Sequence, residues 1–174
     1  MSGKATSATR ALDAACVAYR LHEYSHDSSS TASYGLEAAD ALGVDPARVH
    51  KTLLASVDRR GREELVVAVV PVDAMLDLGA LAAAIGGKRA EMANTADAER
   101  STGYVVGGIS PLGQRRPLAT VIDADAEIYD TIYVSAGRRG LEVELAGTDL
   151  ARLTGGVFAE IARRERRASP DRQM

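Results

Sequence analysis

A lysine that begins a β-rich run is the first residue of this chain whose type and position could do chemistry. Lys51 stands in the sequence Val-His-Lys-Thr-Leu-Leu at residues 49–54, and it is one of three lysines among 21 basic residues. If Lys51 points to the inside of a strand, it is a partly desolvated cation that favours an anionic ligand, and such groups concentrate at functional sites. A lysine at a strand edge that faces the solvent is the alternative interpretation.

A glycine-rich loop is the second such segment. Gly103, Gly107, Gly108 and Gly113 fall within eleven residues of sequence. Each glycine weakens a regular element because it has more conformational freedom to lose. Glycine also lets backbone N–H groups approach a phosphate or an oxyanion closely. The pattern therefore predicts either a ligand-binding loop or a bulge that is followed by a turn at Ser110-Pro111.

Serine and arginine stand together in the third segment, which reads Ser-Ala-Gly-Arg-Arg-Gly at residues 135–140. A hydroxyl at the end of a β-rich run, next to an arginine pair, suits the rim of a ligand site, although an ordinary hairpin loop has the same composition. The net charge of the chain is −3, but local arginine pairs can still bind a nucleic-acid backbone with salt-sensitive affinity. These pairs are Arg115 with Arg116 and Arg138 with Arg139.

The composition excludes several other kinds of site. The single cysteine, Cys16, excludes an intramolecular disulfide and fits a reducing cytoplasm, and its place in the apolar periodic run 12–19 predicts a small buried side chain. His22, His26 and His50 have no cysteine pairs beside them, so we expect no metal ion. The sequence contains no nucleotide-binding or nucleophile-elbow motif, so we expect no cofactor. No apolar run approaches the roughly 20 residues that span a bilayer, and the N-terminus has no signal-peptide pattern, so we expect no membrane contact.

Periodicity and turn residues predict interleaved helices and strands that would position these segments. The expected helices are residues 7–20, 34–42 (closed by Gly43), 78–85, 95–100 (capped by Asn94) and 148–153 (capped by Thr148), and an amphipathic element of undecided type follows at 157–164. The expected strands are residues 21–25, 51–57, 64–71, 88–92, 118–123, 131–135 and 141–145. The second and third of these strands form one hairpin, and the last two form another.

These elements indicate an α+β fold, in which helices pack around a mixed and curved β-sheet. A chain of 174 residues is long enough to bury a sizeable core. Because the sequence has no internal repeat and no linker, we expect one domain over residues 1–174, with an ordered core at about 8–164 and a frayed tail at 165–174.

Taken together, the three segments resemble the YbaK family of Cys-tRNA(Pro)/Cys-tRNA(Cys) deacylases, which is related to the editing (insertion) domain of bacterial prolyl-tRNA synthetase. The matching sequences are HKTLL at 50–54, STGYVVGGISPLGQ at 101–114, TIYVSAGRRGLEVELA at 131–146 and EYSHD at 23–27. The resemblance implies the aminoacyl-tRNA synthetase-associated editing fold, a barrel-like mixed sheet around a pocket. It also implies a cytoplasmic trans-editing enzyme that removes cysteine mischarged on tRNA(Pro), with tRNA and prolyl-tRNA synthetase as partners.

The same resemblance implies the roles of individual residues. Lys51 matches the catalytic lysine of the family's pocket, where it would anchor the terminal adenosine or its phosphate region, or polarise the ester. The expected substrate-binding residues are Tyr24, Gly107, Gly108, Ile109 and Ser135. Backbone N–H groups of the glycine-rich loop would hold the carbonyl oxygen of the ester. The candidate contacts to tRNA are Arg115, Arg116, Arg138 and Arg139.

In this family the thiol of the substrate is thought to attack its own ester carbonyl, and holding the two together is worth up to about 7–11 kcal/mol. A direct hydrolytic route, a deacylase for alanine or serine on tRNA, and a non-catalytic tRNA- or nucleotide-binding module remain as alternatives. Two departures bear on substrate preference. Ala136 stands where relatives have glycine, and Leu36 stands where relatives often have an acidic residue.

Overall fold

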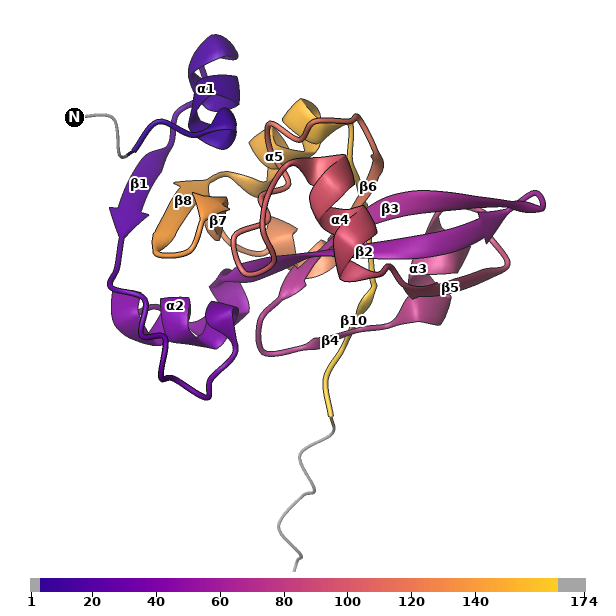
Figure 1. Ribbon diagram of the computed structural model, residues 1–174, viewed down its shortest axis with the longest axis horizontal. Helices are drawn as coiled ribbons and strands as arrows, with labels where there is room; N and C mark the ends of the chain where they lie inside the picture. The colour runs from indigo at the N-terminus through magenta and orange to yellow at the C-terminus, as the bar shows by residue number, and fades with distance from the viewer. Residues whose placement is uncertain (1–3, 166–174) are drawn as a thin grey trace, which may run out of the picture.

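The computed structural model describes residues 4–165, and its largest element is a five-stranded β-sheet (Figure 1). The strands follow one another in the order β5-β2-β3-β6-β9. They are β2 (His50–Arg59), β3 (Arg62–Pro71), β5 (Arg89–Met92), β6 (Ala119–Asp123) and β9 (Val157–Ala159). β2 pairs antiparallel with β3 and β5, whereas β6 lies parallel to both β3 and β9. The sheet is therefore mixed, as the sequence predicts.

A three-stranded antiparallel sheet of order β1-β8-β7 lies beside it. Its strands are β1 (Arg20–Glu23), β7 (Ile132–Arg138) and β8 (Leu141–Leu145), and a small pair joins β4 (Met75–Leu76) to β10 (Ala162–Arg163). Within residues 4–165 a single parallel bridge, Val49 to Tyr133, links the two larger sheets. The sheets do not close into a barrel, so the fold is a mixed α/β single domain without the expected barrel-like closure.

The β2–β3 hairpin is built on a two-residue turn. Arg60 and Gly61 have φ of 56° and 77°, and they stand between the paired residues Arg59 and Arg62. Two successive positive φ values indicate a type I′ turn, whose twist matches that of the strands it connects. The hairpin is confirmed, but both strands continue further than predicted and the charged segment 58–63 is mostly strand.

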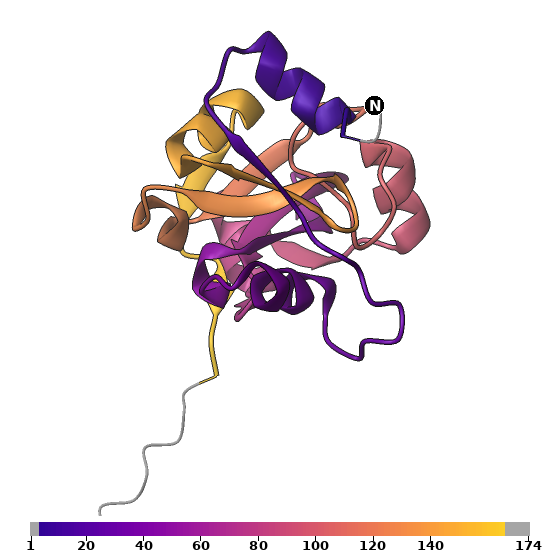
Figure 2. The same ribbon diagram turned by 90° about the vertical axis from the view of Figure 1, so that its left-hand side faces the viewer.

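Five helices surround the sheets in the described part of the chain, together with two 3-10 turns. They are α1 (Ser7–Ala14), α2 (Tyr34–Leu42), α3 (Leu78–Ala84), α4 (Thr95–Thr102), α5 (Gly147–Thr154), η1 (Pro46–Arg48) and η2 (Ala124–Glu127). α2 has the predicted bounds, because Ser33 caps its start and Gly43, with φ of 66°, closes it. Figure 2 shows α1 and α2 at opposite ends of the three-stranded sheet. No helix among the described residues has the length and apolar character that crossing a membrane requires.

Some local predictions are wrong. α1 ends at Ala14, earlier than predicted, because Cys16 has φ of 54° and turns the chain. This turn leaves Cys16 exposed instead of buried. Thr148 is not a cap, since α5 already begins at Gly147 and its N-cap residue makes no side-chain hydrogen bond. The predicted tail at 165–174 lies outside the described residues except for its first residue.

β2 and β3 divide the core into layers. On one face, Leu54 and Val67 belong to the same buried cluster as Val143 of β8. On the other face, Val57 packs in a cluster with Leu81 of α3. A smaller cluster forms under α2 and consists of Ala38, Ala39, Val49, Val72 and Tyr133. Burial of apolar side chains on both faces, at about 25 cal/mol per Å², holds β2 in place.

Candidate active site

A cavity of about 320 Å³ lies along the first half of β2. β3 pairs with one edge of this segment, but on the other edge the described strands leave a gap between the bridge at Val49 and the start of the β5 pairing at Ala55. The walls come from separate parts of the chain. They include residues 33–35 at the start of α2, 49–53 of β2, the end of β5 with the start of α4, residues 106, 107 and 109 of the glycine-rich loop, Ser135 of β7 and Glu142 of β8.

The structure brings four of the predicted site residues together around this cavity and leaves others outside it. The residues that line it are Lys51, Gly107, Ile109 and Ser135. Tyr24 does not line it but lies in a neighbouring hollow with His26 and Arg138. Gly108 packs directly behind the cavity wall, because a Cβ there would come within 2.8 Å of the Cα atom of Arg138.

Lys51 is a partly buried cation at the cavity wall. It lies in β2 opposite Val70 of β3. Burial lowers the pKa of its ammonium group, and the negative charge of Asp73 acts in the opposite direction. Among residues 4–165 no carboxylate forms a salt bridge with it. The ammonium group is therefore able to meet an anionic or polarisable part of a ligand.

Two residues of the glycine-rich loop that line the cavity have unpaired backbone N–H groups within the described chain. Gly107 and Ile109 line the cavity, and their N–H groups find no acceptor among the described residues. The N–H of Gly108 is used internally, because it donates to the carbonyl oxygen of Val105 at 2.9 Å. Of the loop positions proposed to hold an ester oxygen, Gly107 and Ile109 are thus the ones with a free donor.

Gly107 also fits where no larger residue can. Its φ is 90°, and a Cβ would lie 2.6 Å from Nε of Arg139 and 2.8 Å from the ring of Tyr34. The guanidinium of Arg139 stacks on that ring with 4.5 Å between Cζ and the ring centroid, and it donates to the carbonyl oxygen of Val106 at 2.6 Å. Arg139 therefore links the glycine-rich loop to α2 beside the cavity.

Replacement of Gly107 by alanine is expected to lower the free energy of unfolding by about 2–3 kcal/mol, since it adds backbone strain and displaces Arg139 from Tyr34. Urea denaturation measures this cost. Gly43→Ala is the matched control, because Gly43 also has positive φ but a Cβ there would meet nothing within 4 Å. That variant should lose only about 1 kcal/mol. Equal losses in the two variants would show that the crowding at Gly107 is unimportant.

The arginine pairs occupy different parts of the surface. Arg138 is exposed and lies 3.4 Å from Glu23, whereas Arg139 contacts Tyr34 and Val106 of the cavity lining. Arg115 and Arg116 donate their backbone N–H groups to the last residues of α4. Arg116 lines a separate hollow with acidic residues of β5 and α4. The structure therefore places only the pair on the β7–β8 turn next to the cavity.

Glu142 is a cavity residue that the sequence reasoning missed. It is only 7% exposed, and burial raises the pKa of its carboxyl group to about 8. The available signal was the alternation of Leu141-Glu142-Val143-Glu144-Leu145, in which the apolar residues face the core and both glutamates face the other way. Tyr24 lies in the neighbouring hollow. Burial and the negative charge of Glu142 raise the pKa of the Tyr24 hydroxyl to about 12.

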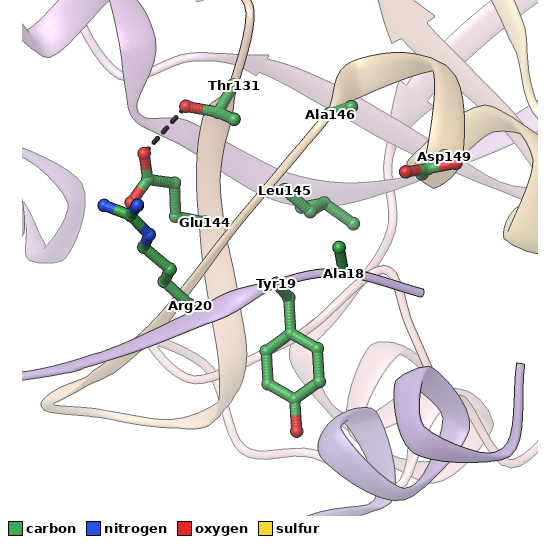
Figure 3. A pocket seen from close by; sticks show the side chains of 8 residues that line it. All are labelled: Ala18, Tyr19, Arg20, Thr131, Glu144, Leu145, Ala146 and Asp149. Carbon is green, nitrogen blue, oxygen red and sulfur yellow. Dashed lines mark hydrogen bonds between the residues drawn. The ribbon is translucent and has the colours of Figure 1, made fainter. Parts of the chain in front are cut away.

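Glu144, two residues along the same strand, has polar partners for its carboxylate. It lies at a different hollow, where Figure 3 shows it between Arg20 and Thr131. Its carboxylate accepts hydrogen bonds from the Thr131 hydroxyl at 2.8 Å and lies 2.8 Å from Nε2 of His22. The pKa of Glu144 is lowered, because these hydrogen bonds and nearby positive charges outweigh its burial. Glu144 therefore has a structural role that Glu142 lacks.

His50 and Thr52 complete the β2 wall and were also missed. The Nδ1 atom of His50 lies 3.2 Å from the carbonyl oxygen of Arg48, and burial lowers the pKa of the ring. The Nε2 atom of His50 and the hydroxyl of Thr52 have no hydrogen-bond partner in the described part of the chain. Their only sequence signal was that both flank Lys51.

The two departures from the family pattern have modest structural effects. The positive φ values of the β7–β8 turn region fall on Gly137, at 105°, and on Gly140, at 83°. Ala136 is buried without positive φ, so its side chain does not strain the turn. Leu36 is 41% exposed on α2 and leaves the cavity lining unchanged.

Comparisons with known proteins identify relatives of this chain. A model of the aminoacyl-tRNA editing domain matches residues 29–153. The chain is 40% identical over 162 residues to the Enterococcus faecalis (strain ATCC 700802 / V583) protein named "Putative Cys-tRNA(Pro)/Cys-tRNA(Cys) deacylase EbsC". This match covers 92% of this chain and 94% of the relative. The chain is also 35% identical over 104 residues to the "Multifunctional Ser/Thr-tRNA deacylase ProXp-y" of Escherichia coli (strain K12), which covers 59% and 62%.

A solved structure has the same fold. The crystal structure titled "a putative trans-editing enzyme for prolyl tRNA synthetase" superimposes with a TM-score of 0.74 at 25% identity, over 91% of this chain and 98% of that one. The resemblance read from the three segments is confirmed by these matches. The chain belongs to the aminoacyl-tRNA editing domain family, of the YbaK type.

Proposed function

We propose that this protein is a trans-editing aminoacyl-tRNA deacylase that removes cysteine from tRNA(Pro). The observation that supports this most is the composition of the cavity wall. Lys51, Ser135, Gly107 and Ile109 line one space of about 320 Å³, and the N–H groups of the two loop residues have no acceptor among the described residues. A cation, a hydroxyl and backbone donors are the groups that bind an ester and stabilise negative charge on its oxygen.

The reaction is an attack of the cysteine thiol on its own ester carbonyl. The sulfur–carbon bond forms, the bond from the carbonyl carbon to the ribose oxygen breaks, and the thiol proton ends on the ribose hydroxyl of the released tRNA. The cysteine leaves as a thiolactone. The N–H groups of Gly107 and Ile109 bind the carbonyl oxygen while it is negatively charged, and Lys51 anchors the nucleotide or polarises the ester.

A second specificity has support from the relative that is named a Ser/Thr-tRNA deacylase. A hydroxyl side chain would occupy the place of the thiol, and the ester would then be cleaved by water. Alanine on tRNA and a non-catalytic tRNA- or nucleotide-binding module are the remaining alternatives.

The partners follow from the same proposal. The 3′ end of an aminoacylated tRNA is the ligand, and the arginine pair Arg138–Arg139 at the cavity mouth is the candidate contact to its backbone. A domain of this size has few surfaces with which to choose a tRNA, so we propose that prolyl-tRNA synthetase supplies that choice in the cytoplasm.

A panel of mischarged tRNAs tests the function. We expect release of cysteine from Cys-tRNA(Pro) to exceed release of serine or alanine from the same tRNA by at least about 100-fold, because only cysteine carries the attacking thiol. The assay is run with and without prolyl-tRNA synthetase. Equal rates for cysteine and serine would favour the hydrolytic Ser/Thr reaction, and binding without deacylation across the panel would favour the non-catalytic module.

A further inference from the structure

Glu142 reaches the cavity through its side chain alone. β8 is the central strand of its sheet, and Glu142 is paired with His22 of β1 on one side and with Ser135 of β7 on the other. Its backbone is therefore separated from β2 and the cavity by the whole of β7. Since Glu142 nevertheless lines the cavity, we infer that its side chain is the part that reaches this space.

The carboxyl group of Glu142 has no partner within residues 4–165. No hydrogen bond or salt bridge to it is found there, although it is 93% buried. Its neighbour on the same face, Glu144, shows what a purely structural carboxylate has in this sheet, namely a hydroxyl donor and an imidazole within 2.8 Å. A buried carboxylate without such partners is costly, and it is retained where a cationic ligand group compensates it.

The substrate end of an aminoacyl-tRNA carries one cationic group, the α-ammonium. We propose that the carboxylate of Glu142 binds this α-ammonium group, so that the cavity selects tRNA esters with a free amine and rejects N-acylated ones. The inference rests on the proposed function and extends it to a rule of substrate choice.

The position of Ser135 agrees with this assignment. Directly opposite residues in an antiparallel pair have Cβ atoms about 4.5–5.5 Å apart, and Ser135 is the cross-strand partner of Glu142. The Ser135 oxygen accepts the N–H of Gly137 at 3.2 Å, which leaves its own O–H free to donate to a ligand. The α-amine and the ester carbonyl of an amino acid are attached to the same carbon. One substrate can therefore meet Glu142 and Ser135 together.

The test compares Cys-tRNA(Pro) with N-acetyl-Cys-tRNA(Pro) in single-turnover deacylation. We expect the wild type to prefer the free amine by about 30-fold, the loss typical of removing a charge-assisted hydrogen bond. In Glu142→Gln, which keeps the shape of the side chain, the preference should fall to about twofold or less. Glu144→Gln is the matched control on the same strand face and should keep the wild-type preference. Equal rates for the two substrates in the wild type, or an unchanged preference in Glu142→Gln, would overturn the inference.

A binding measurement separates this inference from the proposed function. The probes are 3′-cysteinylamino-3′-deoxyadenosine, whose amide link resists cleavage, and its N-acetyl derivative, titrated against wild type and Glu142→Gln. A preference of the wild type for the free amine that is lost in Glu142→Gln supports the inference, even if no tRNA in the panel is deacylated and the deacylase proposal fails. Deacylation of Cys-tRNA(Pro) without any such preference keeps the deacylase and overturns the role of Glu142. Failure of both probes to bind overturns it as well.

Discussion

Replacement of Lys51 by alanine is expected to reduce deacylation by at least about 100-fold and to leave the fold intact. The ammonium group is one of few groups at the cavity wall that can stabilise negative charge, and loss of a single such donor typically costs a factor of 100 to 1,000. The stability should change by about 1 kcal/mol or less, because burial already lowers the pKa of Lys51 and no carboxylate in the described chain pairs with it. Single-turnover deacylation and thermal unfolding measure the two effects.

Lys88→Ala is the control for this variant. Lys88 is exposed between α3 and β5, and it lies outside the cavity lining. It should retain the full rate. Full activity of Lys51→Ala would remove the catalytic role of Lys51, and a large loss of stability in that variant would show that the lysine is structural instead.

The stability of the fold is expected to fall as pH rises from about 4.5 to 8, and Glu142 is the cause. Burial raises the pKa of its carboxyl group from 4.5 to about 8, so between these values the folded protein holds a proton that the unfolded chain has released. Stability decreases with pH wherever the folded state binds more protons, by up to about 1.4 kcal/mol per pH unit for one group. His22 is the cross-strand partner of Glu142, and His50 and Lys51 line the same cavity, so the contribution of Glu142 is isolated by comparing the wild type with a variant at this one position.

Glu142→Gln should remove this decrease, so that the variant is more stable than the wild type by several kcal/mol at pH 8 and similar to it at pH 4.5. Urea denaturation at a series of pH values measures the difference. Glu144→Gln should instead be less stable than the wild type at neutral pH. The lowered pKa of Glu144 stabilises the folded protein there, and this stabilisation is lost as the pH falls through the pKa of Glu144 in the folded protein. A stability curve that is the same for wild type and Glu142→Gln would mean that Glu142 is not desolvated in the folded protein.

The sequence predicts the local elements well where their signals are local. The hairpin of β2 and β3 follows from two β-rich runs separated by a charged segment, and α2 follows from its closing glycine. α1 is too long in the prediction, because the apolar periodicity continues past Ala14 while the backbone of Cys16 turns with φ of 54°. A cysteine residue does not by itself predict a positive φ.

The cavity is less predictable than the elements. Three residues stand out in the sequence because a charged, a glycine or a hydroxyl residue is unusual in or beside a β-rich run. They are Lys51, Gly107 and Ser135, and the structure brings them together. Glu142 does not stand out, since a glutamate that alternates with apolar residues is usually a solvated side chain. It is paired with β1, whose residues are more than 100 positions away in sequence. Long-range pairing of this kind has no local signature.

The pairing of β1 with β8 has a consequence for how the protein is made. Arg20 lies opposite Glu144, and the cavity walls come from β2, the glycine-rich loop, β7 and β8. Contacts between residues so distant in sequence form late, because the loop between them must first be closed. During synthesis β2 and β3 can pair early, but β1 remains an unpaired strand until β8 has been translated. The cavity wall therefore lacks Ser135 and Glu142 until β7 and β8 have been translated.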